Sequence, residues 1–224
     1  MKKAWALGLA ALLVLTMFAG CRGKDDTYAP ETSGIYLRED GSVVSADIEE
    51  FAQSYYDKAE LQAFVEDEVT AYNREKAGLS YAYAEDAKAA DKNNVLPVSI
   101  AGLETGEKKA SLYLEYATCR DYLDFNGEAN AVLTALSQTT VQEAAEAGTS
   151  FAGLKDTESA AADEAKIRKK KKYACLTLTV AEGQEESLSL QVQGSVQYVS
   201  SNVTITGENT VTVPSGETAV IIYK

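Results

Sequence analysis

Among the carboxylates of this chain, Glu68 is the one whose sequence context best suits acid–base chemistry. It lies between Phe64, Val65 and Tyr72 in a helical pattern, so at about 100° per residue its side chain is expected in the middle of an apolar stripe. Burial raises the pKa of a carboxyl group and allows it to exchange a proton near neutral pH. Two structural interpretations compete: Glu68 lies at the edge of the stripe, or a tyrosine hydroxyl or an arginine binds it. An exposed Glu68 would end the catalytic interpretation.

Two other segments partly match known ligand-binding loops but lack residues that those loops require. Asp121–Gly127 is similar to part of a calcium loop. Placing Gly127 at the sixth position, however, puts Tyr122 first and Leu133 last, where the loop needs carboxylates. Gly102–Lys108 lacks the spacing and the hydroxyl residue of a phosphate loop. We therefore expect no metal site and no bound cofactor, and interpret the two segments as a helix end and a turn.

Missing residue types exclude several reaction classes. The chain contains no histidine, which removes Ser-His-Asp and Cys-His activation and most zinc or copper sites. Beyond Cys21, the cysteines are Cys119 and Cys175, both in apolar or alternating segments. An exported protein could join them in a disulfide, and buried free thiols fit the same pattern equally well. Neither has a histidine to activate it as a nucleophile.

The N-terminal segment carries the most specific pattern. Lys2 and Lys3 precede the apolar run Ala4–Phe18, which is short for a membrane crossing, and Ala19-Gly20-Cys21 follows. This order resembles the lipobox of bacterial lipoproteins, although Phe18 stands where that family usually has leucine. The resemblance implies that residues 1–20 are a signal peptide and that Cys21 carries palmitate-type acyl chains. Two chains suffice for stable anchoring at about 0.8 kcal/mol per buried methylene. An ordinary secretion signal with an incidental cysteine is the alternative.

The length and charge of the rest of the chain limit its domain count and its classes of partner. Removal of residues 1–20 leaves about 200 residues, enough for one sizeable core or two small domains. The formal net charge is −13, and residues 25–91 hold 17 acidic against 5 basic residues. This balance argues against nucleic acid as a partner. A cationic partner or loosely held calcium would suit the acidic part, but a solvated surface is the simpler interpretation.

A basic run, Lys166–Lys172, interrupts this acidity. If the protein is held at a membrane, the run could contact anionic lipid head groups or anionic wall polymer. The alternative is a solvated loop that guards the edge of the strand after it.

The N-terminal half predicts a tether, a hairpin and a helix. Residues 21–33 are polar and aperiodic, which indicates a flexible tether. Asp40-Gly41 between apolar runs predicts a β-hairpin starting near Gly34. Asp57, with Glu60 three positions later, resembles a capping box, and the apolar spacing predicts a helix from there to Gly78.

Composition changes along the second half. Residues 81–94 suit a weak helix or a loop; residues 98–100 and 110–116 suit strands; and residues 118–125 suit a helical turn. Residues 129–147 are alanine-rich and predict a helix broken near 137–140, and residues 148–168 suggest a long surface excursion. The end of the chain predicts six short strands, at residues 173–180, 187–193, 195–199, 203–206, 210–213 and 219–223.

We therefore expect an α+β fold: an N-terminal hairpin and an amphipathic helix on a mainly antiparallel sheet (residues 34–168), followed by a β-rich region (169–224) that either shares this core or forms its own. Val196–Ser200 and Ala219–Lys224 are similar to segments of functionally unassigned surface lipoproteins of Gram-positive bacteria. The resemblance implies a location on the extracytoplasmic face of the cell membrane. We expect a non-enzymatic module that binds an extracellular protein or wall polymer. A carboxylate-dependent hydrolase and, third, a transporter-associated solute-binding protein are the alternatives.

Overall fold

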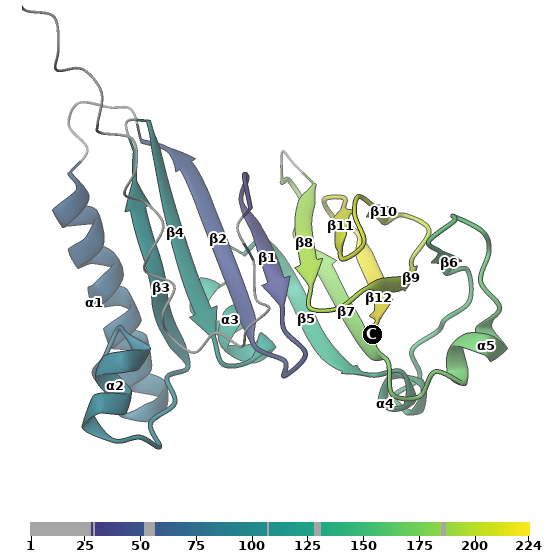
Figure 1. Ribbon diagram of the computed structural model, residues 1–224, viewed down its shortest axis with the longest axis horizontal. Helices are drawn as coiled ribbons and strands as arrows, with labels where there is room; N and C mark the ends of the chain where they lie inside the picture. Colours follow the sequence, from purple (N-terminus) through teal and green to yellow (C-terminus); the bar gives the residue numbers. More distant parts are fainter. Residues whose placement is uncertain (1–27, 29, 52–56, 107, 128–130, 185–186) are drawn as a thin grey trace, which may run out of the picture.

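The computed structural model describes residue 28 and residues 30–51, 57–106, 108–127, 131–184 and 187–224, which form an α+β fold (Figure 1). The strands are β1 (Gly34–Leu37), β2 (Val43–Glu50), β3 (Val98–Thr105), β4 (Lys109–Tyr116), β5 (Leu133–Thr140), β6 (Lys155–Asp156), β7 (Ala174–Val180), β8 (Leu188–Val192), β9 (Val196–Val199), β10 (Thr204–Ile205), β11 (Thr210–Val213) and β12 (Thr218–Tyr223). The helices are α1 (Lys58–Ala77), α2 (Ala84–Ala90), α3 (Cys119–Asn126), α4 (Val141–Glu146) and α5 (Glu164–Arg168). None of the described helices is both long and apolar enough to cross a bilayer.

The strands form two sheets. The first has the order β10-β11-β8-β1-β2-β4-β3, and the second has the order β5-β7-β12-β9-β6. All pairings are antiparallel except β1 with β8, where Ile35 lies opposite Leu190 in a parallel register. The prediction of a mainly antiparallel sheet is confirmed, and the strands of the β-rich region divide between the two sheets (Figure 1).

The predicted N-terminal hairpin is confirmed. β1 and β2 pair in antiparallel register from Gly34–Ala46 to Leu37–Val43. The turn closes through hydrogen bonds from the Gly41 amide to the Arg38 carbonyl and from the Arg38 amide to the Ser42 carbonyl. Gly41 adopts φ +87°, a left-handed conformation that favours glycine. Glycine after aspartate therefore sets the position of the turn.

The helix predicted after Asp57 is confirmed as α1. The Asp57 carboxylate accepts hydrogen bonds from the Ala59 and Glu60 amides, and Gly78 ends the helix at φ +70°. The helix lies beside β3 (Figure 1) and buries Val65, Val69 and Asn73. The expected stripe was too wide, because Phe64 is 63% exposed.

Residues 129–147 were wrongly predicted as a broken helix, since residues 133–140 form strand β5. Leu133 and Leu136, three positions apart, suggest helical spacing in the sequence. A β-bulge shifts the register against β7 between Leu133 and Ala135. The bulge adds one residue, so that both leucines face the core from a strand. Only the last part of the predicted helix is helical, as α4, which begins with a capping box between Thr140 and Glu143.

One large core joins the two sequence regions. Its members come from both sheets and include Leu37, Val65, Leu136, Leu178 and Tyr223. A second cluster lies on the other side of the second sheet and contains Phe151, Leu154 and Ile167. Residues 148–168 are therefore not merely a surface excursion, because Phe151, Leu154 and Ile167 cover that side of the sheet and β6 extends its edge by pairing with β9. Residues on both sides of position 169 share the large core, so the packing does not divide the chain into two domains there.

The predicted tether is fixed at its C-terminal end. Tyr28 is 6% exposed and packs in a third cluster with Tyr36, Val44, Ala46 and Tyr113. The prediction of a flexible segment over residues 21–33 is therefore wrong at Tyr28. Residues 21–27 lie outside the described part of the chain.

Candidate functional site

Glu68 does not form the predicted acid–base site. The structure places it on the exposed side of α1, next to exposed Phe64. The buried residues of the helix are Val65, Val69 and Asn73, so the helix is rotated away from the orientation that would bury Glu68. Glu68 therefore lacks the burial that the acid–base interpretation requires.

Cys119 and Cys175 are free thiols on opposite sides of the second sheet. Cys119 packs against the large core, whereas Cys175 belongs to the second cluster. Along β7, Cys175 lies between Ala174 and Leu176, which point to the opposite face. The sheet therefore separates the two sulfur atoms and prevents a disulfide in this fold. Burial raises the pKa of both thiols, that of Cys175 to about 11, so neither thiol is activated.

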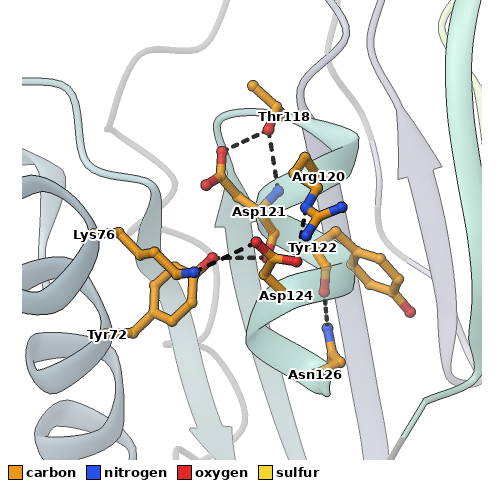
Figure 2. A network of polar contacts seen from close by, with 8 residues as sticks. All are labelled: Tyr72, Lys76, Thr118, Arg120, Asp121, Tyr122, Asp124 and Asn126. Atoms are coloured by element: carbon orange, nitrogen blue, oxygen red, sulfur yellow. Dashed lines mark hydrogen bonds and ion pairs between the residues drawn. The ribbon is translucent and has the colours of Figure 1, made fainter. Parts of the chain in front are cut away.

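The segment that is similar to a calcium loop forms helix α3, as its structural interpretation predicted (Figure 2). Thr118 caps the helix by accepting a hydrogen bond from the Asp121 amide, and Gly127 ends it. The described residues contain no group of three or more cysteines or carboxylates placed to hold a metal ion.

A network of polar contacts joins α3 to α1 (Figure 2). Asp124 accepts from Arg120 at 2.8 Å and from Lys76 at 3.5 Å, and the Tyr72 hydroxyl donates to the Asp121 carbonyl at 3.4 Å. The hydrogen bond from Arg120 is the largest effect that lowers the pKa of Asp124. Burial, with the nearby carboxylates, raises the pKa of Tyr72 to about 12. An ionised Asp124 and a neutral Tyr72 connect α3 to α1, and neither of these two groups is ready to transfer a proton near pH 7.

The best candidate for a binding site lies between the two sheets. The β1–β2 turn, the first residues of α3 and the end of β5 meet at one end of the sheets (Figure 1). They border two adjoining hollows of about 410 and 470 Å³, within the range of small-ligand sites. We call these hollows the junction groove. It is open to solvent and lined by Asp40, Gly41, Thr118, Cys119, Arg120, Ser137, Gln138, Lys172 and Tyr223, among others.

The β1–β2 turn forms one wall of the groove. Side chains from α3 and from chain segments of both sheets contact this turn. Gln138 on β5 donates from Nε2 to the Arg38 carbonyl at 2.9 Å and to the Glu39 carbonyl at 3.3 Å. The Glu39 amide donates to Gln193 Oε1 at 2.9 Å, and Cys119 Sγ lies 3.9 Å from the Gly41 carbonyl. The turn is therefore connected to distant parts of the chain and has little freedom to move. A rigid wall lowers the entropy cost of binding.

Two buried polar atoms beside the groove lack hydrogen bonds. Tyr223 is 1% exposed, and neither its hydroxyl nor Gln138 Oε1 has a hydrogen-bond partner among the described residues. An unpaired buried polar atom costs stability, and such atoms in a native fold often mark a place for a water molecule or a ligand group. These two atoms give the groove an unused capacity for hydrogen bonding.

Two of the three acids that line the groove, Asp40 and Glu143, are held ionised near neutral pH. Partial burial would raise the pKa of Asp40, but hydrogen bonds from the side chain and backbone of Ser42 outweigh burial and hold it below its ordinary value. The backbone and hydroxyl of Thr140 lower the pKa of Glu143 in the same way. A carboxylate-dependent hydrolase needs one acid that stays protonated. Neither Asp40 nor Glu143 meets this need.

The basic run is exposed at the end of the molecule opposite α1 (Figure 1). Within it, Arg168 pairs with Glu164 at 2.7 Å, and Ile167 is buried. Lys172 reaches the junction groove, so the run contributes a positive charge to that site as well as to the surface.

No protein-family model matches the chain, and searches of curated proteins and of solved structures return no match.

Proposed function

We propose that this protein is a lipid-anchored binding module on the extracytoplasmic face of a bacterial membrane, and that the junction groove binds a partner. The order of charges, apolar residues and small residues before Cys21 supports the anchor and the location. The binding function rests on one observation: a rigid, open groove with hydrogen-bonding groups left unpaired beside it.

The lining of the groove suits a polar, extended segment of an extracellular protein. Lys172 and Arg120, whose guanidinium also pairs with Asp124, line the groove together with the carboxylates of Glu39, Asp40 and Glu143, so both signs of charge are available to a partner. A polar segment can pair with such groups without a deep apolar pocket, and the affinity then depends on a few well-placed contacts.

Photocrosslinking in intact cells tests this function. A photoreactive residue at Ser137, which is exposed and lines the groove, is compared with one at Thr134, which is exposed on the same strand outside it. The groove position should give a discrete crosslinked protein that the control position lacks. The double replacement Arg120→Ala and Lys172→Ala should weaken this product. Equal crosslinking from both positions would refute the groove as the binding site.

The anchor is tested separately by replacement of Cys21. Cys21→Ser should abolish fatty-acid labelling and release the protein from membrane vesicles in flotation. Unchanged labelling and flotation would contradict the anchoring part of the proposal.

A further inference from the structure

The segment just after the predicted anchor packs on the outer face of the first sheet. Tyr28 stacks on Tyr36 with ring centroids 5.2 Å apart and planes 13° from parallel. The two rings share a cluster with Val44, Ala46 and Tyr113, on the side of β1, β2 and β4 that faces away from the large core. This contact removes almost all of the Tyr28 surface from water.

Two further contacts hold the same segment. The Ile48 amide donates to the Ser33 hydroxyl at 2.8 Å, and that hydroxyl donates to the Ile48 carbonyl at 3.2 Å. Lys109 Nζ donates to the Glu31 carbonyl at 3.2 Å. Tyr28, Glu31 and Ser33 therefore fasten the chain to β1, β2 and β4. We call Tyr28 and residues 30–33 the docked segment.

We propose that the docked segment makes the outer face of β1, β2 and β4 the membrane-facing side of the protein. This inference rests on the proposed lipid anchor at Cys21. Only seven residue steps separate Cys21 from Tyr28, and a fully extended chain covers about 3.5 Å per step, so Tyr28 stays within about 25 Å of the acyl attachment. A free tether that reached to Ser33 would add about 18 Å to that limit. Docking thus shortens the spacer and selects the face that lies near the lipid head groups.

The chain supplies a matched pair of variants for a test. The Tyr28 hydroxyl is buried and has no hydrogen-bond partner among the described residues. Tyr28→Phe keeps the stacked ring and removes only this unpaired group, whereas Tyr28→Ser removes the ring. Both replacements lie outside the junction groove, so neither should change partner crosslinking.

The experiment uses the full acylated protein in vesicles of phosphatidylcholine and phosphatidylglycerol. Hydrogen exchange of the peptide that covers residues 28–34 should be the same in wild type and Tyr28→Phe and roughly tenfold faster or more in Tyr28→Ser. Energy transfer from a donor at Glu50 to labelled lipid should fall only in Tyr28→Ser.

The failures of the two proposals are distinguishable. If the protein does not float with vesicles, the lipid anchor is wrong, while hydrogen exchange in detergent still tests the docking of Tyr28. If it floats and Tyr28→Ser leaves both exchange and energy transfer unchanged, the docked segment does not orient the protein and this inference is overturned.

Discussion

The side chain of Asn73 should be among the most important polar groups for stability. It is fully buried on α1, at 0% exposure. Its Nδ2 donates to the Val98 carbonyl at 2.7 Å and to the Tyr81 carbonyl at 2.8 Å, and its Oδ1 accepts from the Val98 amide at 3.0 Å. The amide therefore pairs with the outer edge of β3 as a neighbouring strand would, and it ties α1 to the first sheet.

Asn73→Ala would leave the amide and carbonyl of Val98 and the carbonyl of Tyr81 without their partner. Each buried polar group left unpaired costs about 1–3 kcal/mol, so with partial relaxation we expect a loss of about 3–5 kcal/mol in the free energy of unfolding. With a urea m-value of about 2 kcal/mol/M, the midpoint should fall by roughly 1.5–2.5 M. Urea unfolding followed by far-UV circular dichroism measures this shift.

Gln62→Ala is the matched control on the same helix. Gln62 is exposed, and its amide donates to Glu66 at 2.8 Å, so this replacement also removes a hydrogen-bonded amide. It should change stability by less than about 0.5 kcal/mol. A difference of less than about 1 kcal/mol between the unfolding free energies of Asn73→Ala and this control would be comparable to the error of such measurements. That result would refute the reasoning about the edge of β3.

Asn73→Asp adds a pH dependence with a defined sign. The new carboxyl group would face the Val98 and Tyr81 carbonyls, so folding should favour its protonated form and raise its pKa above the unfolded value of about 3.9. The stability of this variant relative to wild type should be highest below that pH and decrease as pH rises through the folded pKa. A constant difference between pH 4 and pH 7 would contradict this account.

Three further predictions concern a buried tyrosine, a glycine turn and the two thiols. Burial raises the pKa of Tyr116 from 10.0 to about 12, so between these pH values the folded state keeps a proton that the unfolded state releases. The contribution of Tyr116 to stability should be intact below pH 10 and fall by about 1.4 kcal/mol per pH unit up to pH 12. Tyr116→Phe should remove that part of the slope in urea titrations. Gly194 has φ +111°, and a Cβ there would collide with the carbonyl that follows β12, whereas Gly183 has φ +81° and open space around it. Thermal melts should show a much larger loss of stability for Gly194→Ala than for Gly183→Ala. Equal losses of stability would count against the collision. Mass spectrometry of the folded protein should find Cys119 and Cys175 reduced, and a disulfide between them would contradict their placement on opposite sides of the second sheet.

The elements that the sequence predicted well are those with strong local signals. Asp57 and Gly78 mark the ends of α1, and Asp40-Gly41 marks the hairpin turn, because capping and left-handed turns depend on a few neighbouring residues. The short strands after residue 173 were also predicted, since their β-branched residues lie between turn residues.

Errors occurred where a local pattern had two meanings. The alanine-rich composition of residues 129–147 favours a helix, but Leu133–Thr140 forms strand β5, in which a bulge brings Leu133 and Leu136 to the same face. The apolar residues of α1 allowed more than one rotation, and contact with β3 selects the one that exposes Phe64 and Glu68. In both cases the partner surface, which lies far away in the sequence, resolves the ambiguity.

No local sequence pattern predicts the candidate site. The junction groove depends on Gln138 reaching the β1–β2 turn and on Tyr223 lying beside it, and no motif joins these residues. Local backbone preferences specify turns and helix ends within a few residues. The pairing of β1 with β8, the division of the last strands between two sheets and the groove between them all depend on contacts between distant segments, which form only when the whole core packs.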